Sequence, residues 1–203
     1  MDIIFLDFAK AFDKVSHIKL ISKLKAHGIN GKLWIKEWLH QRTQRVSIRG
    51  VSSDWINVLS GVPQRSVLGC VLFLIFINDL DIGIKSWILT FADDSKIFNR
   101  VNCTANVESL QMDLHTLITW SEEWQMLFDV SKCKVMHVGT MQFERQYLMN
   151  DQKLEVVTEE NDLGMVISSD LKVSQKLYDP ERLVLSQISL TPRSLTESVV
   201  ASS

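Results

Sequence analysis

Three aspartates carry the most distinctive chemistry that this sequence offers. Asp7 follows an apolar run, while Asp93 and Asp94 stand side by side between two further apolar runs. Carboxylates that converge repel one another unless a cation lies between them, and their hard oxygens suit Mg²⁺. Two such ions about 3.5–4 Å apart can hold the attacking and leaving oxygens of an in-line phosphoryl displacement. The aspartates therefore form a candidate site for two-metal nucleotidyl transfer, with Mn²⁺ as an alternative to Mg²⁺.

The same residues also have a simpler interpretation. An Asp-Asp pair between two strands is most often a solvated turn, because short polar side chains favour turns. The five histidines are scattered without the spacing of metal ligands. The three cysteines form no CxxC pair, which argues against a zinc site or a disulfide framework and for a reducing compartment. Only a fold that brings Asp7 to the Asp-Asp pair favours the catalytic interpretation.

Hydrophobic periodicity predicts the elements that must position these aspartates. A strand over residues 2–8 carries Asp7 at its end, and strands over 87–91 and 96–98 flank a turn that holds Asp93 and Asp94. The other predicted elements are helices over 16–26, 32–39, 66–80 and 105–128, a hairpin of 45–49 with 55–59, and strands over 133–138, 147–157 and 163–167.

This order predicts an α+β fold. Without the first hairpin, the elements read β-α-β-β-α-β, which is the ferredoxin-like, or split βαβ, arrangement with helical and hairpin insertions. In such a sheet the first strand lies beside the central hairpin, so Asp7 becomes a neighbour of Asp93 and Asp94. From residue 176 the sequence loses both helical and strand periods, which predicts a disordered tail over 176–203.

Charge is distributed unevenly along the chain. The net charge of the 203 residues is -2, yet residues 1–50 hold ten basic and four acidic side chains, and the remainder holds twelve basic and twenty acidic ones. The basic quarter is either a set of solvated helices or a face for a polyanion. No apolar run approaches the about 20 residues of a membrane span, and no basic leader precedes the first strand. We therefore expect no membrane association and a cytoplasmic or nuclear, non-secreted protein.

Several segments, in order, resemble the reverse transcriptase domain of non-LTR (LINE-type) retrotransposons. They are FLDFAKAFDKV at 5–15, LSGVPQ at 59–64, SVLG at 66–69, LFLIFINDL at 72–80, FADD at 91–94, WQMLFDVSKCKVMHVG at 124–139 and DLG at 162–164. The resemblance covers about residues 2–175 and implies a polymerase palm that uses an RNA template, a DNA primer and deoxynucleoside triphosphates.

The resemblance also implies a role for individual residues. The metal ligands are Asp7, Asp93 and Asp94, with the backbone of Phe8 beside the metal. The remaining roles are the nucleotide-binding residues Phe12, Gln64 and Arg65, a lysine near the triphosphate, Lys132, and a primer grip at Leu163 and Gly164.

Two departures from the family pattern shape the functional hypotheses. Arg65 stands where the family has a glycine, and the resemblance spans a palm over 1–175 without the fingers and thumb, as in a truncated fragment. The first hypothesis is an RNA-directed DNA polymerase, active alone or with a partner that supplies fingers and thumb. The second is a non-catalytic remnant that at most binds nucleic acid. The third is a nucleotidyl-cyclase-like metal enzyme on the same sheet.

Overall fold

The computed structural model describes residues 1–29, 32–40, 42–139, 145–170 and 173–174. The chain divides into two compact units, residues 1–156 and 157–203, and each is described by itself. The tail predicted over 176–203 lies outside the described residues. The extent of the palm over 1–175 stays a prediction.

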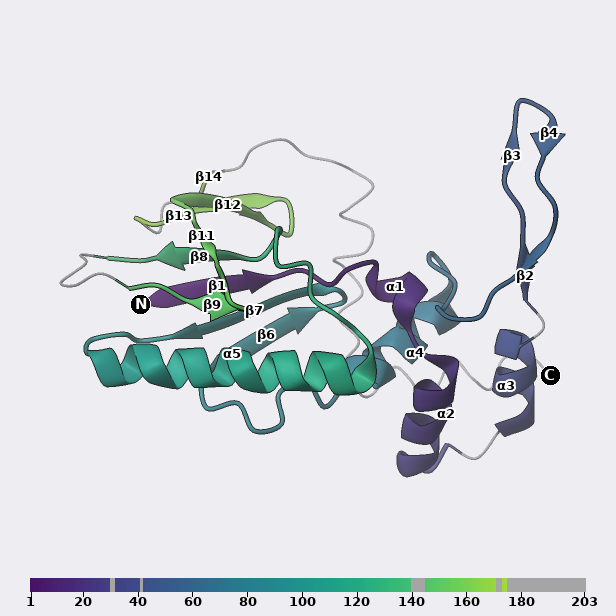
Figure 1. Cartoon of the computed structure of the whole chain (residues 1–203), viewed down its shortest axis with the longest axis horizontal. Coiled ribbons are helices and arrows are strands. Elements are labelled where there is room, and N and C mark those ends of the chain that lie inside the picture. Colours follow the sequence, from purple (N-terminus) through teal and green to yellow (C-terminus); the bar gives the residue numbers. More distant parts are fainter. Residues whose placement is uncertain (30–31, 41, 140–144, 171–172, 175–203) are drawn as a thin grey trace. The chain divides into compact units, whose positions relative to one another are not determined.

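A five-stranded sheet forms the framework of the first unit (Figure 1). Its strand order is β11-β8-β1-β7-β6, with β1 in the centre. β1 pairs antiparallel with β7 and with β8, β6 pairs antiparallel with β7, and β11 runs parallel to β8. The strands are β1 (Asp2–Leu6), β6 (Trp87–Phe91), β7 (Asp94–Asn99), β8 (Lys134–His137) and β11 (Glu155–Val156).

One face of this sheet is covered by the long helix α5 (Thr104–Trp124), as Figure 1 shows. The helix buries Leu110, Leu114 and Leu117, whose spacing places them on one face. Ile4 and Leu6 of β1 point into the same core, because alternate residues of a strand face the same side. Asp113 of α5 is also buried and accepts hydrogen bonds from the backbone amides of residues 85 and 86, which fixes the start of β6.

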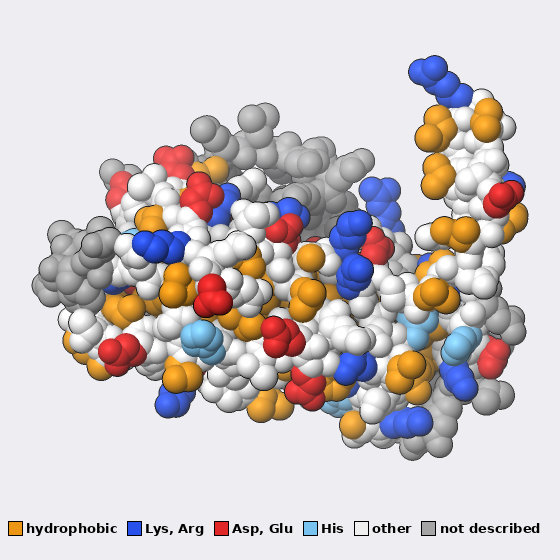
Figure 2. All heavy atoms as spheres, viewed as in Figure 1, with side chains coloured by type: hydrophobic (Ala, Val, Ile, Leu, Met, Phe, Trp, Pro, Cys, Tyr) orange, Lys and Arg blue, Asp and Glu red, His pale blue; other side chains and the backbone are white. Residues whose placement is uncertain are grey.

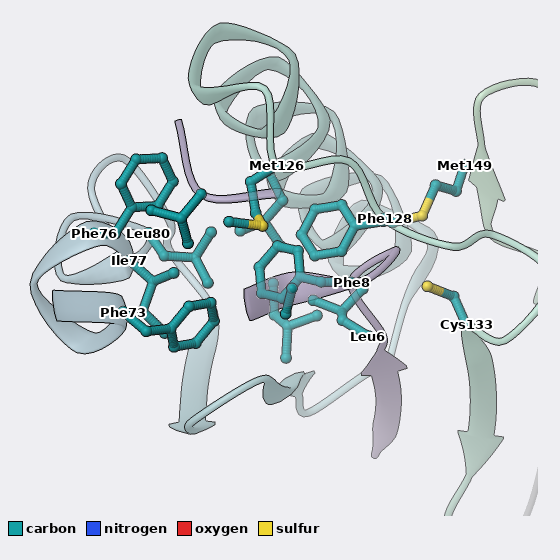
Figure 3. Packing of buried hydrophobic residues seen from close by; sticks show 14 of the residues in the cluster. Leu6, Phe8, Phe73, Phe76, Ile77, Leu80, Met126, Phe128, Cys133 and Met149 are labelled. Carbon is teal, nitrogen blue, oxygen red and sulfur yellow. The ribbon is translucent and has the colours of Figure 1, made fainter. Parts of the chain in front are cut away.

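The described residues of the first unit form four more helices: α1 (Ala11–Lys14), α2 (His17–Ala26), α3 (Lys32–His40) and α4 (Val67–Ile77). The nearly all-apolar α4 packs its phenylalanines against the aromatic core beside Phe8, Met126 and Phe128 (Figure 3). Lys23 of α2 is buried in this region, donates to the carbonyl of Phe76 and to Asp79, and lies 3.6 Å from the centroid of the Trp124 ring. None of the helices in the described part of the chain combines the length and apolar character that a bilayer crossing requires.

A hairpin forms in the region of the predicted one, but its strands differ from 45–49 with 55–59. The positive φ values of Arg49 and Gly50 place the turn there, so residues 51–52, which lay between the predicted strands, pair with 47–48. The observed hairpin consists of β2 (Thr43–Gln44), β3 (Ser47–Ile48), β4 (Val51–Ser52) and β5 (Ile56–Asn57), which pair antiparallel as β2 with β5 and β3 with β4. Arg49 and Gly50 form its two-residue turn with φ of 50° and 85°, the positive values that such hairpin turns require.

The predicted helix over 105–128 is too long. The helix ends at Trp124, because Gln125 adopts φ 58° and ψ 31° and its amide bonds back to the last turn. Residues 126–128 then run in an extended path beside the end of β1. Periodicity favoured helix there because Leu127 and Phe128 continue the apolar pattern, but pairing with another segment of the chain decides the outcome.

The predicted strands over 147–157 and 163–167 are also corrected in detail. The first is broken into β9 (Leu148–Met149), β10 (Gln152–Lys153) and β11, since Asn150 and Asp151 both have positive φ and form a tight turn. In the second unit, Leu163 and Gly164 are a turn and not strand residues. They join β12 (Glu159–Asp162) to β13 (Met165–Ser168), which also pairs with β14 (Val173–Ser174).

Candidate active site

Strand register places Asp7 opposite Asp94. The pairing of β1 with β7 ends with Leu6 opposite Ser95, so the next antiparallel step sets Asp7 against Asp94. Residues opposite one another in an antiparallel pair point to the same face. That face is the one turned away from the buried side chains of Leu6 and Ser95. Two carboxylates that are 87 positions apart in the sequence are thus neighbours on an open sheet face.

Asp93 lies in the turn that joins β6 to β7. Phe91 pairs with Asp94, so Ala92 and Asp93 form a two-residue hairpin turn. Ala92 has φ 53°, a left-handed conformation that is strained for a residue with a Cβ. The sequence placed both aspartates in the turn, but Asp94 is the first residue of β7. Both side chains are exposed.

Residues 127–129 pair with residues 7–9, which directly follow β1, and this pairing brings Lys132 close to Asp7. The amide of Ala9 donates to the carbonyl of Leu127 at 2.8 Å, and the amide of Asp129 donates to the carbonyl of Asp7 at 2.8 Å. Between these bonds the rings of Phe8 and Phe128 stack with centroids 4.5 Å apart. The Phe8 ring is therefore part of the core, and only its backbone remains available to the site.

A tight turn then carries the lysine to the aspartates. The amides of Lys132 and Cys133 both donate to the carbonyl of Asp129. The Lys132 Nζ lies 3.4 Å from Asp7 Oδ1 and 3.6 Å from Asp129 Oδ2. Its pKa is raised chiefly by the negative charge of Asp7, and the pKa of Asp129 is lowered chiefly by the hydroxyl of Ser131, which donates to it at 2.6 Å.

Asp129 is a site residue to which the sequence motifs gave no role. Its backbone holds Asp7 and its carboxylate holds Lys132. The signal available in the sequence was its position three residues before Lys132, the spacing of a single turn. Cys133 lies under the same site, where burial raises the pKa of its thiol to about 11, so it stays protonated.

The donor set of this site suits a hard divalent cation, although the described residues assemble no group of three or more His, Cys, Asp or Glu side chains around a metal position. Asp7 already holds a cation, the Lys132 ammonium, at 3.4 Å. Register brings the carboxylate of Asp94 to the same edge. These oxygens are the ligand type that Mg²⁺ prefers.

Of the predicted nucleotide-binding residues, Phe12 is held by α4. Its ring stacks on Phe73 with centroids 4.5 Å apart and remains partly exposed. Gln64 and Arg65 are exposed in the loop before α4. That loop is anchored by Ser66, whose hydroxyl donates to the carbonyl of Pro63 and accepts from the amide of Gly69.

Arg65 occupies a backbone conformation that favours glycine. Its φ is 62°, and a left-handed residue with a Cβ costs about 1–2 kcal/mol relative to glycine in the same place. We predict that Arg65→Gly raises the free energy of unfolding by about 0.5–1 kcal/mol, since the greater freedom of glycine in the unfolded chain offsets part of the gain. Urea unfolding measures this change. Arg100→Gly, at an exposed position without positive φ, is the matched control, and an equal rise in both variants would contradict the explanation.

The predicted primer grip belongs to the second unit. Leu163 and Gly164 have φ of 51° and 84° and form the two-residue turn between β12 and β13. This geometry matches the hairpin turns in which both central residues have positive φ. The role of this turn at a primer stays a prediction.

Comparison with known proteins decides the family. The model of the family described as "Reverse transcriptase (RNA-dependent DNA polymerase)" matches residues 2–177. The chain belongs to the reverse transcriptase family. Together with the mobile-element relatives described next, this match confirms the assignment made from the motifs, a non-LTR retrotransposon reverse transcriptase.

Relatives of this reverse transcriptase are polymerases of mobile elements. The chain is 32% identical over 139 residues to the "RNA-directed DNA polymerase from mobile element jockey" of Drosophila melanogaster, covering 64% of this chain and 15% of that protein. It is 32% identical over 141 residues to the "Probable RNA-directed DNA polymerase from transposon X-element" of the same species, with the same shares. The chain thus spans about 15% of the length of these relatives.

Solved structures share the fold of this reverse transcriptase. The apo telomerase of Candida tropicalis, truncated from its C-terminal domain, matches with a TM-score of 0.54 at 10% identity, covering 86% of this chain and 35% of that one. The telomerase of the same species in complex with a fragment of telomeric RNA matches with a TM-score of 0.53 at 11% identity, covering 86% and 29%. At such low identity the likeness concerns the fold alone.

Proposed function

We propose that this chain is the palm of an RNA-directed DNA polymerase that performs two-metal nucleotidyl transfer. The observation that carries the proposal is the register that sets Asp7 opposite Asp94, with Lys132 bound to Asp7. The antiparallel order β8-β1-β7-β6, with α4 and α5 as connections, supports a ferredoxin-like, split βαβ palm.

The residues of the site have distinct roles in this proposal. Asp7, Asp93 and Asp94 would hold the divalent cations. Mg²⁺ or Mn²⁺ bound there would supply positive charge that stabilises the reacting phosphoryl oxygens. Lys132 contributes a further positive charge that offsets the charge developing on the triphosphate. Asp129 keeps Lys132 next to Asp7 through the ion pair at 3.6 Å.

The substrates follow from the family assignment. We propose an RNA template, a DNA primer and a deoxynucleoside triphosphate, with the exposed edge of the Phe12 ring below the sugar and Gln64 and Arg65 beside the nucleotide. The primer grip at Leu163 and Gly164, and a longer chain or partner that supplies fingers and thumb, belong to the same proposal. The longer chain or partner is supported by the coverage of the relatives, since this chain spans 15% of the length of the jockey polymerase.

A second candidate is a non-catalytic remnant that binds nucleic acid. Two observations favour it: the described residues form no metal-holding group of three carboxylates, and Arg65 extends from a loop position with φ 62° where the family has glycine. This candidate predicts nucleic-acid affinity without nucleotide transfer.

Primer extension on an RNA template tests both candidates. The unchanged chain is compared with Arg65→Gly, with a double Asp93→Asn, Asp94→Asn variant and with Asp13→Asn, an exposed control. We expect extension with Mg²⁺ or Mn²⁺ that the double variant lowers by at least about 10²-fold, since losing a single preorganised electrostatic group, such as one oxyanion-hole donor, already costs about 10²–10³-fold in other active sites. Extension only after Arg65→Gly locates the defect in the loop. If no variant extends the primer at protein concentrations that bind template, the result contradicts the polymerase proposal and favours the remnant.

A further inference from the structure

The hairpin over residues 42–58 has two chemically different faces. Arg45 lies opposite Trp55 and Val46 opposite Ser53, since these positions continue the pairing of β2 with β5 and of β3 with β4. Asp54 is therefore an extra residue between two pairs, a β-bulge. Because of this extra residue, the pairs on both sides of Asp54 alternate between the same two faces. Each face of the hairpin can therefore be described by the residue pairs that point to it.

The first face is polar and basic, and we call it the Arg–Trp face. Its members are Thr43, Arg45, Ser47, Ser52, Trp55 and Asn57. Two contacts place these side chains together. The Arg45 guanidinium lies 4.6 Å from the centroid of the Trp55 ring, and the hydroxyl of Ser52 donates to that of Ser47 at 3.1 Å.

The opposite face is mostly apolar. Val46, Ile48, Val51 and Ile56 share it with Gln44 and Ser53, and these four apolar side chains are 58% to 76% exposed. Figure 2 shows hydrophobic side chains along the hairpin and a basic side chain at its tip. An apolar face of this kind suits contact with protein, whereas the Arg–Trp face lacks the aliphatic side chains that such a contact needs.

The Arg–Trp face has the features of a strand-binding surface. Trp55 is 60% exposed, so its indole presents area beyond the part that Arg45 covers. Of the three arginines in the hairpin, Arg45 lies on this face and Arg49 lies in the turn at its end, whereas the guanidinium of Arg42 lies 5.8 Å from the centroid of the Trp38 ring. The hairpin contains a single carboxylate, Asp54. An aromatic ring on which a base stacks, beside a cation that meets a phosphate, is the combination that binds single-stranded nucleic acid without sequence preference.

We propose that the Arg–Trp face of the 42–58 hairpin binds single-stranded nucleic acid, with a base stacked on Trp55 and a phosphate on Arg45. This binding needs neither the aspartates nor a divalent cation. It is therefore separable from nucleotide transfer, and the chain binds a strand through this hairpin whether or not it polymerises.

Fluorescence anisotropy of the full chain tests the proposal. The probes are labelled oligouridylate and oligothymidylate strands about 12 nucleotides long, within the range that such surfaces bind, in a buffer without divalent cations. We expect Trp55→Ala to weaken binding by about tenfold, the effect of losing one stacked base. Arg45→Gln should weaken binding and reduce the slope of log K against log salt by about 0.7, the value for one phosphate contact on a single strand.

Two controls separate this result from general effects of charge or folding. Ile56→Ala changes the neighbouring residue on the apolar face, and Arg100→Gln removes an exposed arginine outside the hairpin; both should bind as the unchanged chain does. Circular dichroism confirms that each variant keeps its secondary structure. Ultraviolet cross-linking of the unchanged chain should attach the oligonucleotide to the peptide that contains Trp55.

Defined outcomes overturn the proposal. Unchanged affinity in both Trp55→Ala and Arg45→Gln does so, as does an equal loss in Arg100→Gln, which would indicate attraction to charge alone. If Ile56→Ala weakens strand binding and Trp55→Ala does not, the hairpin makes its contact through the apolar face instead. Strand binding is measured without divalent cations and through Trp55 and Arg45, whereas primer extension is tested through the aspartates, so failure of primer extension and failure of strand binding are distinguishable.

Discussion

Asp2→Asn is expected to lower the free energy of unfolding by about 3 kcal/mol or more at neutral pH, because the substitution removes the buried carboxylate charge that pairs with the buried Arg145. Asp2 is 0% exposed. Its Oδ1 accepts from Arg145 Nη1 at 2.6 Å, and its Oδ2 accepts from the Tyr147 hydroxyl at 2.6 Å. The imidazole Nδ1 of His137, opposite Asp2 in the sheet, lies 3.0 Å from Oδ1.

The loss should depend on pH in a defined direction. Burial by itself raises the pKa of Asp2, but His137, Tyr147 and Arg145 outweigh it, so the pKa of this carboxyl lies below its ordinary value of 3.8. A group with a depressed pKa in the folded state contributes stability above its unfolded pKa and loses that contribution as the pH falls through the folded one. The difference between the unchanged chain and Asp2→Asn should therefore be full above pH 3.8 and shrink below it.

Urea unfolding at a series of pH values measures this difference. Asp13→Asn, the same change at an exposed position, is the control and should cost a few tenths of a kcal/mol, as exposed substitutions do. Tyr147→Phe removes a single hydrogen bond and should cost about 1 kcal/mol. A stability difference for Asp2→Asn that stays constant down to the acid transition would contradict the ionised, paired state of Asp2.

The second large effect is expected for Gly69→Ala in α4. A Cβ at this position would lie 2.0 Å from the carbonyl oxygen of Pro63 and 2.7 Å from the hydroxyl of Ser66. The loop over 63–66 must move to remove these steric clashes, and this movement breaks the hydrogen bond by which Ser66 caps the amide of Gly69. Overpacking against a backbone atom and loss of the cap together should cost about 3 kcal/mol or more.

The matched control is Gly28→Ala. Nothing lies within 4 Å of a Cβ there, and the cost arises only from φ +73°, at about 1–2 kcal/mol. Thermal unfolding of both variants compares the two mechanisms. Gly69→Ala should also alter primer extension, since Gln64 and Arg65 belong to the displaced loop. Equal destabilisation of the two variants would show that displacing the 63–66 loop costs little free energy, which would contradict the steric explanation.

The sequence alone determined the family and most of the elements. The motifs that assign the chain to the reverse transcriptases are short and contiguous, as in residues 5–15 and 91–94, so no fold is needed to find them. Elements with a clear local period were predicted to within a few residues, for example α2 and β6. Local periodicity suffices for such elements because the same burial pattern repeats in every turn or every second residue.

Only the tertiary structure decided what surrounds the aspartates. The end of α5 at Trp124 follows from the pairing of residues 127–129 with 7–9, and this pairing delivers Lys132 and Asp129 to Asp7. The positive φ of Arg65 and the buried pairing of Asp2 with Arg145 likewise depend on neighbours far away in the sequence. Periodicity reports which side of an element is buried, whereas these contacts depend on which distant segment occupies the opposite position, and that is fixed only when the whole sheet assembles.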